Sequence, residues 1–94
     1  MDSIIQTEKQ CYVCASRNNL ELHHCIYGVG KRQLSDKYGL VVWLCREHHR
    51  TGKNAVHFFK PLDNNLKELA QTKAMNYYNW SLDDWMKIFR RNYL

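Results

Sequence analysis

Residues 20–28 read LELHHCIYG, with the adjacent histidines His23 and His24 at their centre. The run Leu20–Ile26 predicts a short β-strand that is broken by the glycines after it. Successive side chains of a strand point to opposite faces, so we expect the two imidazoles to have different roles. One imidazole can bind a metal while the other accepts a proton or packs in the core.

Two pairs of candidate metal ligands flank this strand. They are a CxxC motif, Cys11 and Cys14, and a CxxH motif, Cys45 and His48. Each pair supplies two ligands from one turn, which is typical of a tetrahedral structural zinc site. A redox role would need a thioredoxin-like βαβ unit, for which this chain is too short, and the spacing excludes a classical zinc finger. The odd cysteine, Cys25, could replace a ligand, but a small buried core thiol is the simpler interpretation.

The segments around these motifs predict a strand, a connection, a second strand and a short helix. Residues 1–10 are expected to form a loose arm or a short lead-in, and residues 31–39, KRQLSDKYG, a polar connection that covers or grips a ligand. Gly39–Leu44 predicts a strand because it is rich in β-branched and aromatic residues. Cys45–Arg50 is compatible with a helix, which we expect to end at residues 51–52.

The remainder of the chain predicts a helical extension. Apolar residues recur at helical spacing after residue 61, and Asp63 or Asn65 could cap this first helix. Ser81, followed three residues later by an acid, opens a second helix in the manner of a capping box. We therefore expect one domain, with a core in residues 1–60 and two helices in residues 61–94 that pack on it.

The composition narrows the class of partner. The chain has 94 residues, 45% of them hydrophobic, and a net charge of +5, so it is a small domain of the size that often needs a metal or disulfides for stability. The first sixty residues hold nine Lys/Arg, five Asp/Glu and all five histidines, which suits a nucleic acid, although solvated surface charge is the alternative. No segment resembles a membrane span or a signal peptide, so we expect an intracellular protein with reduced thiols.

Three histidines lie next to the predicted zinc ligands without belonging to them. His49 directly follows His48 on the same predicted helix, and His23 and His24 lie on the strand between the two ligand pairs. A zinc ion that joins both pairs would bring these imidazoles close together. Imidazoles that converge on a basic surface predict a second metal site, this one open to substrate. A surface or core role for each histidine is the alternative.

In this order, the CxxC motif, LELHHCI and LCREHHR resemble the HNH endonucleases, the zinc-bearing branch of the ββα-metal (His-Me finger) nucleases. The resemblance covers roughly residues 11–57 and is nearest to small phage-encoded HNH proteins. It implies a small α+β fold in which a structural zinc stabilises a ββα-metal core, here with a C-terminal two-helix extension. It also implies metal-dependent hydrolysis of DNA, duplex DNA above all, in a bacterial or phage-infected cell.

The resemblance also implies roles for single residues. His24 matches the general base, His23 and His49 match ligands of the catalytic ion, and His57 is a third ligand or a phosphate contact. Mg²⁺ or Mn²⁺ is the expected ion, and an imidazole-rich site also suits Ni²⁺, Co²⁺ or Zn²⁺. The products would carry 5′-phosphate and 3′-hydroxyl ends. Backbone phosphates of DNA would be contacted by five basic residues: Lys31, Arg32, Lys37, Arg50 and Lys53.

Two departures from the family pattern stand out. His48 replaces the usual cysteine, which a Cys₃His zinc site tolerates. The family's middle asparagine is absent, with Gly39 or Leu40 in that region, so His24 needs another partner, for which a backbone carbonyl is a candidate.

A zinc-binding DNA-recognition module without catalysis, or a packaging or assembly component, is the alternative function. The sequence leaves DNA specificity and oligomeric state open, a dimer included.

Overall fold

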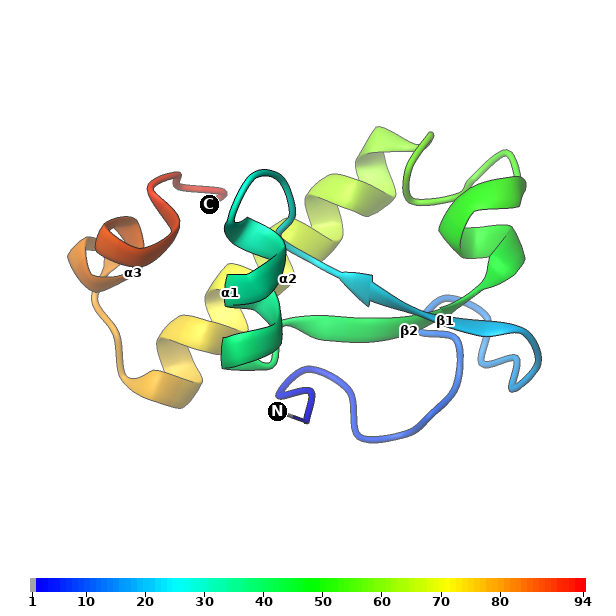
Figure 1. Cartoon of the computed structure of the whole chain (residues 1–94), viewed down its shortest axis with the longest axis horizontal. Helices are drawn as coiled ribbons and strands as arrows, with labels where there is room; N and C mark the ends of the chain where they lie inside the picture. The colour runs from blue at the N-terminus through cyan, green and yellow to red at the C-terminus, as the bar shows by residue number, and fades with distance from the viewer. Residues whose placement is uncertain (1) are drawn as a thin grey trace.

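A two-stranded antiparallel sheet lies at the centre of the fold, which a computed structural model describes for residues 2–94 (Figure 1). Strand β1 covers Leu20–His24 and strand β2 covers Val41–Cys45. Their register pairs Leu20 with Cys45. Both predicted strands are confirmed, although β1 ends two residues earlier and β2 begins two residues later than expected.

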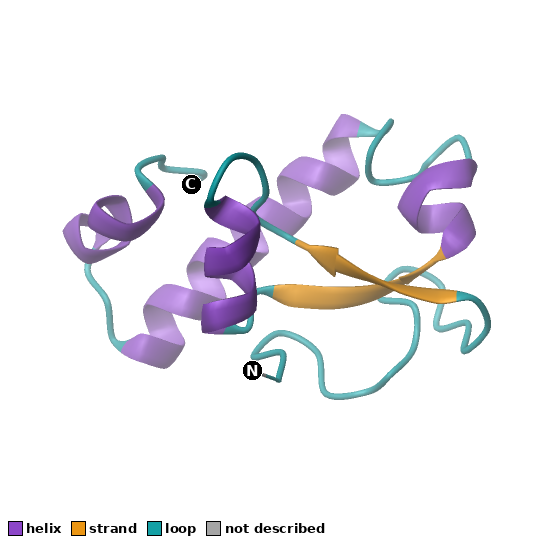
Figure 2. Ribbon diagram, viewed as in Figure 1, coloured by secondary structure: helices purple, strands orange, loops and turns teal. Residues whose placement is uncertain are grey.

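Four helical segments complete the described part of the chain: α1 (Lys31–Tyr38), the π-helix η1 (Glu47–Thr51), α2 (Lys60–Tyr78) and α3 (Leu82–Phe89). Helix α2 is the longest and runs behind α1 and the sheet in the view of Figure 1. Helix α3 lies at the end of the molecule opposite to η1 (Figure 2). The molecule is therefore a small α+β fold with one antiparallel strand pair, as predicted at this level of detail.

Residues 31–39 do not form the predicted polar connection, because they fold into α1 and its C-terminal cap. Gly30 and Gly39 border the helix with φ angles of 77° and 75°, a left-handed conformation that glycine adopts without strain. Leu34 and Tyr38, one helical turn apart, pack against the core. The helix was missed because only these two apolar side chains mark its buried face, which gives too weak a periodic pattern.

The first ten residues were expected to be a loose arm or a short lead-in, and those described lie along the free edge of β2. Ser3 Oγ donates a hydrogen bond of 2.5 Å to the carbonyl of Val41, and the amide of Trp43 donates one of 2.8 Å to Gln6 Oε1. In a two-stranded sheet each strand has an unpaired edge, and its peptide groups need partners where they are buried. The N-terminal segment supplies these partners for β2.

The caps of the C-terminal helices match the sequence prediction in one case of two. The residue before α2 is Phe59, which provides no side-chain cap, so the predicted capping by Asp63 or Asn65 is wrong. The capping box of α3 is confirmed: Ser81 Oγ accepts from the amide of Asp84 at 3.1 Å, and the Asp84 carboxylate accepts from the amide of Ser81 at 2.9 Å. These bonds lower the pKa of the Asp84 carboxyl group.

The hydrophobic core joins the sheet to the C-terminal helices. In α3, Trp85 and Phe89 are fully buried and stack with their ring centroids 4.0 Å apart. The other large members of this cluster are Ile26, Leu40, Val42, Leu44, Val56 and Leu66. The apolar faces of the C-terminal helices are thus used mainly in packing.

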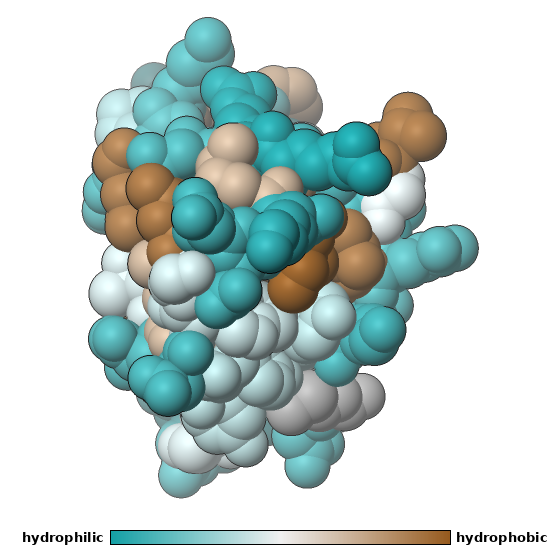
Figure 3. Space-filling view, turned by 90° about the vertical axis from the view of Figure 1, so that its left-hand side faces the viewer, coloured by the Kyte–Doolittle hydropathy of each residue, from teal (hydrophilic) through white to brown (hydrophobic). Residues whose placement is uncertain are grey.

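At the end of the molecule that carries α3, few large hydrophobic side chains are exposed. Figure 3 views this end, where hydrophobic side chains form separate patches among hydrophilic ones. Leu82 and Leu94 are among the exposed hydrophobic residues of this part of the chain.

Within residues 2–94, no helix combines the length and the apolar character needed to cross a membrane.

Candidate metal centres

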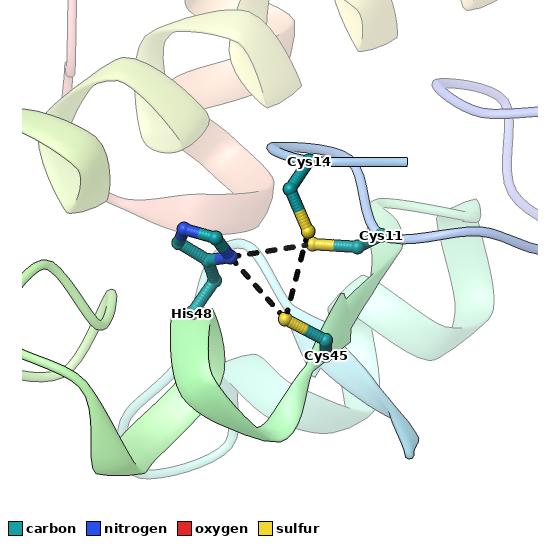
Figure 4. A group of neighbouring side chains, drawn as sticks. All are labelled: Cys11, Cys14, Cys45 and His48. Carbon is teal, nitrogen blue, oxygen red and sulfur yellow. Dashed lines mark hydrogen bonds between the residues drawn. The ribbon is translucent and has the colours of Figure 1, made fainter. Parts of the chain in front are cut away.

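Four side chains with metal-binding atoms meet where the turn of Cys11 and Cys14 approaches the end of β2 (Figure 4). The Sγ atoms of Cys14 and Cys45 lie 3.8 Å apart, and His48 Nδ1 lies 3.2 Å from Cys45 Sγ and 3.8 Å from Cys11 Sγ. In a tetrahedral site with Zn–S bonds of about 2.3 Å, sulfur atoms lie about 3.8 Å apart. The donor atoms therefore fit a structural metal such as zinc.

The surroundings of the cysteines move the pKa values of two ligands in opposite directions: burial raises the pKa of Cys45, whereas that of Cys11 is lowered. Burial alone would raise the pKa of Cys11, but hydrogen bonds from backbone amides and from Cys14 outweigh it and lower the pKa to about 7. The thiolate is the form that binds metals. Cys25 lies outside this group, is completely buried, and has its pKa raised to about 12 by burial. Cys25 is therefore a protonated core thiol, as the sequence predicted.

A second group of possible ligands consists of three histidines: His23 on β1, His49 on η1 and His57 in the loop before α2. One nitrogen atom from each lies within 4.8 Å of the others, and the Nε2 atoms of His49 and His57 are 3.2 Å apart. The three rings border a pocket of about 220 Å³ whose other lining residues are Leu22, His24, Tyr27 and Arg32. The structure thus brings together all four histidines that the sequence assigned to catalysis.

His23 shows most clearly that this pocket fits a cation. Only 2% of the residue is exposed, and its Nε2 atom has no hydrogen-bond partner in the described chain. Burial, reinforced by the neighbouring histidines, lowers the pKa of His23 to about 3, so the ring stays neutral. A neutral imidazole with a buried, unpaired nitrogen is costly without a partner, and a metal ion would satisfy it.

His49 is oriented by a carboxylate that the sequence did not single out. Glu21 Oε1 accepts from His49 Nδ1 at 2.8 Å, which leaves His49 Nε2 directed to the three-histidine group. Arg50 binds the same carboxylate through Nε and Nη2, and these bonds, with those from His49, lower the pKa of Glu21 to about 2. A histidine held in this way by a carboxylate is common behind metal sites. The available signal was that Glu21 and His23 share one face of β1.

His24 has a side-chain hydrogen-bond partner, whereas His23 Nε2 has none in the described chain. The Nε2 atom of His24 lies 2.7 Å from Oδ1 of Asp36 on α1, and its ring also lines the pocket. The partner of His24 is therefore a side-chain carboxylate instead of the backbone carbonyl considered from the sequence. Asp36 escaped notice because it lay in the segment predicted as a connection.

A buried polar group ties α2 to the pocket. The Tyr27 hydroxyl donates to Asp63 Oδ1 at 3.1 Å, and Lys67 Nζ lies 2.8 Å from Asp63 Oδ2. The Tyr27 ring is 5.8 Å from that of His57, and burial followed by the charge of Asp63 raises the pKa of Tyr27. The C-terminal extension thus supports the wall of the pocket, which the sequence did not predict.

The five basic residues predicted to contact DNA occupy different positions. Arg32 lines the three-histidine pocket, whereas Lys53 lines a separate hollow beside His48. Arg50 is paired with Glu21. The ammonium group of Lys37 lies 5.4 Å from the ring centroid of Tyr38, and Lys31 is the first residue of α1. Of these five residues, Arg32 is the one that lines the three-histidine pocket.

Comparison of the chain with protein-family models, with curated proteins and with solved structures finds no match in any of the three. The chemistry of the two groups of ligands is therefore the basis for a functional assignment. One short segment, η1, serves both groups, because His48 belongs to the Cys₃His set and His49 to the three-histidine set. A metal on the first set would fix the position of the second.

Proposed function

We propose that this chain is a metal-dependent endonuclease of the HNH type, in which β1, β2 and η1 form a ββα-metal core around a structural zinc. The observation that carries the proposal is the three-histidine group beside His24 in one pocket. Sequence and geometry support it independently, because the motifs that resemble this family supply the same residues that meet in space. Zinc would be held by the Cys₃His set already described.

The residues of the pocket suit a divalent cation. His23, His49 and His57 present three nitrogen donors, and the unpaired Nε2 of buried His23 is the atom that most needs such a partner. Imidazole donors favour Ni²⁺, Co²⁺ or Zn²⁺ over Mg²⁺, and Mn²⁺ is compatible with them. When bound, the ion would neutralise charge on the scissile phosphate and on the leaving 3′ oxygen.

His24 is the residue assigned to move a proton. Its Nε2 atom is engaged with Asp36, so the remaining ring nitrogen, Nδ1, carries the lone pair of the neutral ring. A neutral imidazole near physiological pH is a suitable general base for the water that attacks phosphorus. The resemblance implies that the products have 5′-phosphate and 3′-hydroxyl ends.

Duplex DNA is the proposed substrate class. The chain carries a net charge of +5, and Arg32 adds a guanidinium group to the wall of the pocket. Contacts to phosphates position a protein on DNA without reading its sequence, so we expect weak sequence preference and binding that weakens as salt rises. The likeness to small phage-encoded HNH proteins extends the proposal to DNA in a bacterial or phage-infected cell.

Cleavage of four substrates side by side tests this function. Zinc-loaded protein is incubated with duplex DNA, single-stranded DNA, branched DNA and RNA, each with Mg²⁺, Mn²⁺, Ni²⁺ or no added ion. We expect cleavage of duplex DNA that requires an added ion and leaves ends that a ligase can rejoin. Binding to DNA without cleavage under any condition would instead identify a recognition module, and the enzyme proposal would fail.

A further inference from the structure

His24 has one specific side-chain partner, and it comes from a different element. The Oδ1 atom of Asp36 on α1 lies 2.7 Å from His24 Nε2, a short distance for an N–H···O bond and typical of a charge-assisted one. The side chain of His24 is 19% exposed, and that of Asp36 is 60% exposed. The contact lies at the edge of the pocket.

The backbone of α1 at Asp36 is held in place by the buried neighbour Ser35. Ser35 Oγ donates to the carbonyl of Ile26 at 2.5 Å and accepts from the amide of the same residue at 3.2 Å. Ser35 is fully buried, and its own carbonyl accepts from the amide of Leu40 at 2.8 Å. These bonds hold α1 against the chain that follows β1. The packing of α1 therefore places Asp36 next to His24.

The two partners have complementary hydrogen-bonding capacities. An ionised carboxylate can only accept, so its contact with Nε2 requires a hydrogen on that nitrogen. The neutral ring then has its lone pair on Nδ1. A carboxylate that holds an imidazole in one tautomer and one orientation is a recurrent support for a general base. Asp36 thus provides the partner that His24 lacks in the absence of the family's middle asparagine.

We propose that Asp36 is the positioning residue of His24: it accepts the Nε2 hydrogen and holds the ring with Nδ1 free to take a proton. This inference rests on the proposed function. Asp36 does not line the pocket and does not belong to the three-histidine group, so it would act through His24 and affect the rate of the chemical step. Binding of DNA does not depend on it.

Removal of the carboxylate in two backgrounds tests this role. We expect Asp36→Ala to lower kcat by about tenfold to a hundredfold, as is typical of residues that orient a functional imidazole, and to leave KM within a few-fold. Asp83→Ala is the control, because it removes an exposed acid of the same charge from α3. In a protein that already carries His24→Ala, Asp36→Ala should have no further effect.

A spectroscopic measurement gives a result that does not depend on cleavage. In ¹⁵N-labelled zinc-loaded protein, the Nε2 hydrogen of His24 should be visible and slow to exchange with water, and Asp36→Ala should abolish this signal. Equal effects of Asp36→Ala with and without His24, a change in KM alone, or a His24 signal unchanged by the substitution would each overturn the proposal. Should the wild type cut no substrate, the proposed function fails, and the signal still decides whether Asp36 holds the ring.

Discussion

Replacement of His24 by alanine is expected to slow DNA cleavage by about 10²- to 10⁴-fold, the usual contribution of a general base. The reason is that the variant loses the proposed proton acceptor. The other three histidines of the pocket form the group of possible metal ligands. The substitution should leave zinc content and the unfolding transition close to those of the wild type, because His24 belongs neither to the Cys₃His set nor to the hydrophobic core cluster. The initial rate of plasmid nicking at saturating ion concentration measures the effect.

Two further variants separate loss of the base from loss of shape. His24→Gln fills similar space but cannot take a proton, so it should be as slow as the alanine variant. Asn76→Ala removes an exposed polar side chain from α2 and should cut at the wild-type rate. If His24→Ala nicked DNA as fast as Asn76→Ala, the assignment of the base would be wrong.

Replacement of Cys45 by alanine should release the structural metal and unfold the domain. Metal binding to a structural zinc site is worth about 10–16 kcal/mol, whereas a small domain is stable by only about 5–15 kcal/mol. Cys45 lies at the end of β2, close to the start of η1, so without its metal ligand neither element is held by the metal at this point. Circular dichroism and the zinc content after gel filtration measure the outcome.

The chain provides a matched control for this experiment. Cys25→Ala makes the same chemical change at another buried position, but Cys25 lies outside the Cys₃His set. This variant should keep one zinc per chain and lose about 1 kcal/mol of stability through a small cavity. The assignment of the structural site would be contradicted if Cys25→Ala lost the zinc and Cys45→Ala retained it.

Much of both sites could be predicted from the sequence because short-range spacing determines it. Cys11 and Cys14 lie in one turn, and Cys45 and His48 at the junction of β2 and η1, so local geometry alone brings each pair together. The expectation that His23 and His24 have different roles follows from the alternation of side chains along a strand, although both rings line one pocket. These features need no knowledge of distant contacts.

The supporting residues could not be predicted because their partners are distant in the sequence. Glu21 meets His49 across 28 residues, and Asp36 meets His24 across 12 residues. Nothing in the composition of KRQLSDKYG indicated that it folds into a helix that carries a carboxylate to the pocket. His57 was assigned from the sequence only as a third metal ligand or a phosphate contact, because its position depends on the conformation of the loop before α2. Its position depends on a turn back to η1, in which the amide of Val56 donates to the carbonyl of His48 at 2.7 Å.

The adjacency of His48 and His49 on η1 links the two groups of possible metal ligands. Adjacent residues of a helix point in different directions, so His48 and His49 can serve separate metal groups from one segment. Loss of the structural metal would therefore displace a ligand of the second group. For this reason the activity of any variant should be compared at equal zinc content.

The rate of plasmid nicking as a divalent ion is added to zinc-loaded protein tests the central claim most directly, with wild type and His49→Ala compared. We expect the wild type to be inactive without added ion and its rate to rise to a plateau with Mn²⁺ or Ni²⁺. His49→Ala should keep its zinc and its fold and show no rise, because the three-histidine group has lost a donor. If His49→Ala follows the wild-type curve, or no ion stimulates the wild type, the three-histidine pocket is not a centre of DNA cleavage.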